Sequence, residues 1–177
     1  MQKTSITSIA SGLVALFATP AVFAHGGIHM DLGLIDGFMH PASGIDHLLV
    51  AIAAGFWAAR RGNHGLRDMS FVLALFAGGL LLGVVSLGWP QLNLVLPVAF
   101  LLVASVFAVA IFRPRLFAHT LFGGLAVYQG LTHMIEVPAA SGMAGFGAGL
   151  FLSTAILMEL GLMLRTVINT YRSHSAD

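Results

Sequence analysis

The 177-residue chain is 58% hydrophobic and only 8% charged, whereas charged residues make up about 25% of an average soluble domain. This composition excludes an ordinary water-soluble domain and predicts an all-α, polytopic membrane helix bundle that faces the lipid bilayer. The net charge of +1 offers no basic surface for nucleic acid, and the lack of cysteine excludes disulfides and thiolate metal sites. A bound metal would need nitrogen and oxygen ligands, or the thioether of methionine.

Residues 1–24 have the pattern of a cleaved secretory signal peptide. A basic residue precedes a short apolar stretch, Pro20 interrupts it, and Val22-Phe23-Ala24 has small residues at the positions that a signal peptidase reads. The alternative is a first membrane anchor, for which the apolar stretch is too short. Cleavage would leave residues 25–177 as a single transmembrane domain.

Five transmembrane helices are predicted after the signal peptide, at about 37–59, 69–87, 93–112, 116–136 and 144–165. The first helix reaches a spanning length only if it includes Asp46 and His47, which places this ionisable pair near the midplane of the membrane. Pro41 disfavours helical geometry at His40, so the first helix is expected to be interrupted near Pro41. Broken helices at membrane depth are typical of transport sites.

Arginines occur at alternate connections of this predicted bundle. They follow the first, third and fifth helices, as Arg60, Arg61, Arg67, Arg113, Arg115, Arg165 and Arg172. The positive-inside rule then places the mature amino terminus outside the membrane and the carboxyl terminus in the cytoplasm. This orientation agrees with a signal peptide that delivers the amino terminus to the outside.

The first helix carries a group of three potential metal ligands, His40, Asp46 and His47. An interruption of the helix could let the three side chains converge. Ser43 with Asp46 also fits a capping-box pattern, which would explain the acid and neither histidine. Because an intramembrane carboxylate beside an imidazole is costly unless it is used or paired, we interpret the group as functional.

A second group, His133 and Glu136, lies at the outer end of the fourth predicted helix. A spacing of three puts both side chains on one helix face, which is how helix bundles present a histidine and a carboxylate to one metal. The alternative is an interfacial ion pair that reaches toward water. Together with the first group, they give three imidazoles and two carboxylates, which suit Ni²⁺, Co²⁺ or Zn²⁺.

Four further polar residues could take part in a cation pathway, and each also has a plainer explanation. They are His25, His29, His119 and Glu159. The first two could chelate a cation at the outer surface or belong to a solvated tail. His119 and Glu159 could bind the cation on its way out to the cytoplasm. Alternatively, His119 reaches the membrane interface and Glu159 pairs with an inner arginine. Small residues such as Gly79 and Gly83 allow helices to approach closely.

The pattern His40-Pro41-x-x-Gly44-x-Asp46-His47-x-Leu49, which continues to Gly55-Phe56-Trp57-Ala58, resembles the signature of the HupE/UreJ family of bacterial nickel/cobalt permeases. A later family motif of the form HGxAHGxExP is matched by Gly130, His133, Glu136 and Pro138. Gln129 stands where that motif has its first histidine and Met134 where it has a glycine, so one possible ligand is missing.

The resemblance implies a permease that imports Ni²⁺ or Co²⁺ across the inner membrane, with the metal as substrate and no permanent cofactor. The implied site consists of His40, Asp46, His47, His133 and Glu136. Hydrogenase, urease or cobalamin metabolism would use the metal. A homo-oligomer and a hydrogenase or urease maturation pathway remain open as partners.

Two other functions are consistent with the same residues. An intramembrane zinc hydrolase would use a three-ligand site to activate water, although no separate general base is evident in the sequence. A metal-responsive sensor or accessory subunit would bind the cation without moving it. We expect no enzymatic activity.

Overall fold

The computed structural model describes residues 33–87, 94–113, 116–137 and 142–174, apart from the side chains of Leu96 and Glu136. These residues belong to one compact unit, Asp31–Asp177. The predicted signal peptide, residues 1–24, lies outside the described residues, and so do His25 and His29 at the start of the predicted mature chain.

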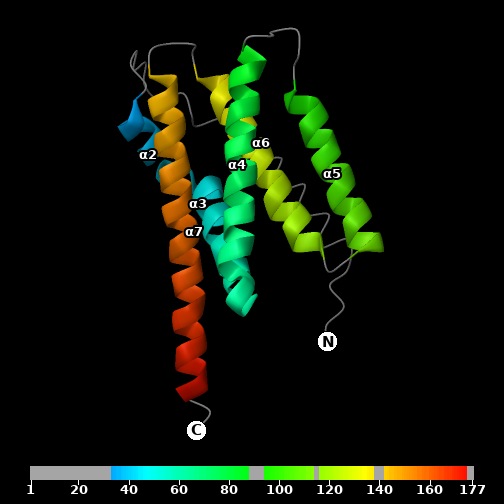
Figure 1. Ribbon diagram of the computed structural model, residues 1–177, viewed down its shortest axis with the longest axis vertical. Helices are drawn as coiled ribbons and strands as arrows, with labels where there is room; N and C mark the ends of the chain where they lie inside the picture. The colour runs from blue at the N-terminus through cyan, green and yellow to red at the C-terminus, as the bar shows by residue number, and fades with distance from the viewer. Residues whose placement is uncertain (1–32, 88–93, 114–115, 138–141, 175–177) are drawn as a thin grey trace. The chain divides into compact units, whose positions relative to one another are not determined.

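All regular structure in the described ranges is helical, which confirms the all-α prediction. The elements are α2 (Leu34–Ser43), α3 (Ile45–Ala59), the 3₁₀ turn η1 (Gly62–His64), α4 (Gly65–Leu87), α5 (Val95–Phe112), α6 (Phe117–Glu136) and α7 (Met143–His174) (Figure 1). Each predicted helix has a counterpart, and α7 continues well beyond its predicted end at residue 165.

Two of the described helices, Gly62–Leu87 and Met143–His174, are long and apolar enough to cross a membrane. The pair α2 and α3 would form a third span if its bent halves are counted together. Helix α5 is apolar but shorter, with its apolar part at Pro97–Phe112. The structure therefore supports a multi-pass membrane protein, and the total of five spans remains a prediction.

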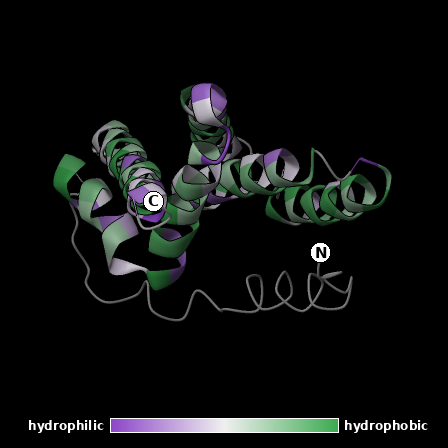
Figure 2. Cartoon of the chain, turned by 90° about the horizontal axis from the view of Figure 1, so that it is seen from below, coloured by the Kyte–Doolittle hydropathy of each residue, from purple (hydrophilic) through white to green (hydrophobic). Residues whose placement is uncertain are grey.

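Large apolar side chains are exposed along the described helices. On α5, Phe100 is 73% exposed and Phe112 is 76% exposed, and Figure 2 shows this helix almost entirely in the colour of apolar residues. In water such a surface would be unfavourable, whereas lipid tails solvate it without cost. This apolar surface is further support for a membrane location.

The first helix is interrupted near Pro41, as predicted, and the break between α2 and α3 falls three residues later, at Gly44. Pro41 lies inside α2, near its end, where its missing N–H forfeits a single helical hydrogen bond. The chain instead turns at Gly44, which has extended geometry (φ −102°, ψ 115°), and the two helices meet at 85°. The Ser43 hydroxyl donates to the His40 carbonyl at 2.7 Å and so satisfies one acceptor at the end of α2.

Helix α7 packs along both halves of the bent pair, and α4 packs most extensively against α6. Glycines bring these backbones into contact. A methyl group on Gly55 of α3 would overlap the carbonyl of Met158 on α7, and one on Gly79 of α4 would overlap the carbonyl of Val127 on α6. Close backbone approach at small residues is a main source of helix association in lipid, where burial of apolar surface contributes little.

Helices α3 and α6 carry polar residues at both ends. In α3, His47 lies in the first turn and Trp57 in the last turn. In α6, His119 lies in the first turn and His133 in the last turn. The two α6 histidines are 14 residues apart, or about 21 Å along the helix. Beside His119, at the beginning of α6, lies a buried carboxylate of α4, Asp68, which is 3% exposed.

Asp68 is surrounded by basic groups. Its carboxylate accepts from Arg61 Nε at 3.0 Å and lies 3.5 Å from His119 Nε2 and 3.8 Å from Arg67 Nε. The His119 ring packs edge-on against Trp57, with 4.8 Å between ring centroids. This cluster joins α4, α6 and the turn after α3, and the arginines make it unsuitable for binding a cation.

Candidate metal centre

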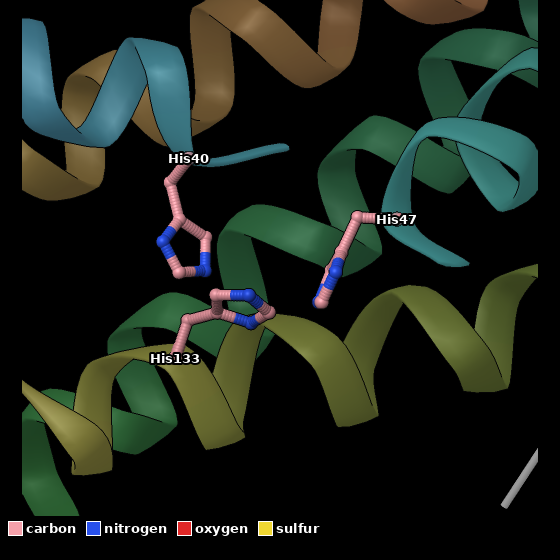
Figure 3. A group of neighbouring side chains, drawn as sticks. All are labelled: His40, His47 and His133. Atoms are coloured by element: carbon pink, nitrogen blue, oxygen red, sulfur yellow. The ribbon is translucent and has the colours of Figure 1, made fainter. Parts of the chain in front are cut away.

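Three imidazoles from three helices converge where α2 breaks into α3. His40 lies in the last turn of α2, His47 in the first turn of α3, and His133 in the last turn of α6 (Figure 3). One nitrogen of each ring can be chosen so that all three atoms lie within 4.8 Å of one another. The ring centroids are 4.5 Å apart for His47 and His133, 4.8 Å for His40 and His133, and 5.8 Å for His40 and His47.

Asp46 is hydrogen-bonded to its neighbour His47 in this structure. Its Oδ1 lies 3.1 Å from His47 Nδ1, and an ionised carboxylate can only accept, so Nδ1 carries the proton. The other ring nitrogen, Nε2, is then left with its lone pair. The helix cap of α3 is the backbone of Gly44, without a side-chain hydrogen bond. The capping role considered for Asp46 is therefore not observed.

The His133 ring is held in the same way by the backbone. Its Nδ1–H donates to the carbonyl of Gln129, one turn earlier in α6, at 2.6 Å. His133 is only 6% exposed, so this bond fixes the tautomer of a buried ring and leaves Nε2 as the acceptor. Gln129 thus contributes through its main chain, although its side chain stands where a histidine was expected.

The cluster is slightly wider than a loaded metal site. A transition-metal bond to imidazole is about 2.1 Å long, so two ligands of one ion lie at most about 4.2 Å apart. The observed limit of 4.8 Å exceeds this by a margin that small side-chain rotations can close. Gly44 keeps the space beside His47 free, because a Cβ there would lie 2.7 Å from His47 Nδ1.

The remaining residues predicted to take part in a metal pathway do not belong to the three-histidine cluster in the described structure. Glu136 is the last residue of α6, but its side chain is outside the described residues. His119 lies at the opposite end of α6, beside Asp68. Glu159 is half-buried on α7 and takes part in none of the ion pairs found in the described ranges.

Sequence reasoning missed two acidic residues that the structure makes notable. Asp68 is buried among basic groups, and Asp36 lies one helical turn before His40 on α2. The spacing of four between Asp36 and His40 is a signal that could have identified the second of them.

Removing the charge of Asp46 is expected to weaken nickel binding by about 10- to 100-fold, the usual effect of losing a carboxylate that orients a ligating histidine. Asp46→Asn preserves a hydrogen-bond acceptor for His47 and removes only the charge. The measurement is Ni²⁺ affinity of the purified protein by calorimetry.

A double-mutant cycle separates an orienting role from direct ligation. If Asp46 acts through His47, adding Asp46→Asn to a His47→Ala variant causes no further loss. A further loss of similar size in that background would contradict the orienting role and make Asp46 a ligand in its own right.

The fold and this cluster define the chain as a polytopic helical membrane protein with three imidazoles gathered between its helices. Residues 13–176 match the family model described as HupE / UreJ protein. The chain is also 32% identical over 163 residues to Protein HupE of Rhizobium leguminosarum bv. viciae, which covers 91% of this chain and 84% of that protein. No solved structure matches.

The chain therefore belongs to the HupE/UreJ family. Membership confirms the resemblance seen in the two motifs and supports a role related to nickel or cobalt transport.

Proposed function

We propose that the protein is a secondary transporter that imports Ni²⁺ or Co²⁺ across the bacterial inner membrane. The observation that carries the proposal is the convergence of His40, His47 and His133 from three helices. Three neutral imidazoles form a nitrogen site of the kind that Ni²⁺ and Co²⁺ bind well. In this proposal Asp46 orients His47, and Glu136 supplies a further carboxylate near the end of α6.

The charge distribution supports an orientation with the histidine cluster toward the outside. Arg60, Arg61 and Arg67 follow α3, at the end opposite His47. By the positive-inside rule this end faces the cytoplasm, together with the carboxyl terminus. The amino terminus of the mature chain is then periplasmic.

A membrane potential provides sufficient driving force for uptake. An interior-negative potential favours entry of a doubly charged ion by about 4.6 kcal/mol per 100 mV, twice the value for one elementary charge. No nucleotide-binding motif of the GxxxxGK[ST] type occurs in the sequence, and we propose that the potential drives transport.

The cluster of three histidines also suits a catalytic zinc ion, because catalytic zinc sites commonly combine three protein ligands with one open position. An intramembrane hydrolase would need, in addition, a general base near the bound water. The carboxylate hydrogen-bonded to the cluster in the described residues is that of Asp46, whose Oδ1 is already engaged by His47. We therefore favour transport, and flux measurements separate the two functions.

The test is uptake of Ni²⁺ and Co²⁺ into proteoliposomes that contain only this protein, with an imposed interior-negative potential. We expect saturable uptake by the wild type and uptake at the level of empty liposomes for His47→Ala. A hydrolase would retain stoichiometric zinc through purification and move no metal. A sensor or accessory subunit would bind Ni²⁺ without flux. Either result would contradict the transporter assignment.

A further inference from the structure

A surface cavity lies on the α2 side of the histidine cluster. Its volume is about 310 Å³, and its lining residues are Asp36, Met39, His40, Ala42, Ser43 and Phe146. All but the last come from α2, and His40 belongs both to this cavity and to the three-imidazole cluster. The cavity therefore borders the candidate metal centre at one shared side chain, that of His40.

The cavity has room for a cation that still carries its water. Six water molecules occupy about 180 Å³ at the density of the liquid, roughly 30 Å³ each. This is less than the volume of the cavity, about 310 Å³. The three-imidazole cluster, by contrast, needs only small side-chain rotations to bond directly to a cation that has lost water.

Asp36 supplies the carboxylate of this cavity. It lies four residues before His40 on α2, so the two side chains share one helix face and are roughly 6 Å apart at Cβ. Asp36 Oδ2 accepts the backbone N–H of Gly33 at 3.0 Å, which caps the helix. A carboxylate has about four acceptor positions, so this bond leaves most of its capacity for a cation or its water.

We infer that Asp36 and this cavity form an outer station, which holds the hydrated divalent cation before it passes to the three imidazoles. This inference rests on the proposed transport function. Carboxylate oxygen attracts a hydrated cation through its charge and through hydrogen bonds to the bound water. His40, which lines both sites, is the first imidazole that the cation meets. Transfer then exchanges water for nitrogen ligands.

The substitution Asp36→Asn tests the station without removing the helix cap, because the asparagine carbonyl can still accept from Gly33. In proteoliposomes we expect the KM for Ni²⁺ uptake to rise about tenfold, the effect of losing the attraction between a carboxylate and a dipositive ion roughly 6 Å away in water. The maximal rate should stay unchanged, because the three imidazoles are intact. Asp36→Glu should keep a KM close to that of the wild type.

Salt provides a second measurement that a purely structural role of Asp36 would not affect. Raising the ionic strength should raise the KM of the wild type and change that of Asp36→Asn much less, because salt screens the missing charge. Equal KM values and equal salt dependence in the two proteins would overturn the outer station. So would a lower maximal rate of Asp36→Asn with an unchanged KM.

The same experiment distinguishes failure of this inference from failure of the proposed function. If the wild type moves no Ni²⁺, the proposed transport function is wrong, and the outer station, which depends on it, is wrong as well. If the wild type transports and Asp36→Asn behaves identically, only the station is wrong.

Discussion

Replacing His133 with alanine is expected to lower the Ni²⁺ affinity of the purified protein by more than about 100-fold, beyond the loss seen when only a supporting residue is removed. His133 is the most deeply buried of the three rings, and its Nδ1 is fixed by the Gln129 carbonyl. The substitution removes one of three nitrogen donors and leaves an apolar gap between the other two. Calorimetric titration of detergent-solubilised protein measures the change.

His174→Ala is the matched control for this substitution. His174 is exposed at the end of α7, and its Nδ1 likewise contacts a backbone carbonyl one turn earlier, that of Thr170, at 2.9 Å. The His174→Ala variant should bind Ni²⁺ with the same affinity as the wild type. Unchanged affinity in His133→Ala, or an equal loss in both variants, would show that the cluster does not hold the metal.

Two adjacent glycines in α4 should respond oppositely to the same small change. A methyl group on Gly79 would overlap the carbonyl of Val127 in α6, whereas one on Gly78 would meet nothing within 4 Å. Gly79→Ala is expected to cost about 1–3 kcal/mol through overpacking. Gly78→Ala should be neutral or slightly stabilising, since alanine is the better helix former by up to about 1 kcal/mol. Thermal unfolding in detergent measures both.

Because α4 and α6 form the most extensive helix contact, Gly79→Ala should also disturb the position of His133. We therefore expect weaker Ni²⁺ binding in Gly79→Ala and normal binding in Gly78→Ala. Equal stability of the two variants would mean that the backbones of α4 and α6 do not approach as closely as described.

The positions of the helices could be predicted well because uncharged stretches of spanning length are a strong signal in a sequence with so few charges. The interruption predicted near Pro41 is present, and it falls at Gly44 and not at Pro41 itself for a physical reason. Pro41 stands near the end of α2, where it removes only one backbone hydrogen bond, whereas Gly44 permits the turn beside His47. A residue that disfavours a helix therefore marked the break only approximately.

The candidate site was predictable in part. The motifs indicated His40, His47 and His133, which the structure brings together. The hydrogen bond from His133 to the Gln129 carbonyl could not be predicted from residue types, because every residue offers a carbonyl. Asp36 was missed because it belongs to neither motif, and its relation to the cluster depends on a cavity formed with α7.

The most direct test of the three-imidazole site is anomalous X-ray scattering from crystals of the protein grown with Ni²⁺. The proposal predicts one strong peak at about 2.1 Å from a ring nitrogen of each of His40, His47 and His133, with Nε2 as the donor of the last two. A peak at another place, or none among these rings when the protein is saturated with metal, would contradict it.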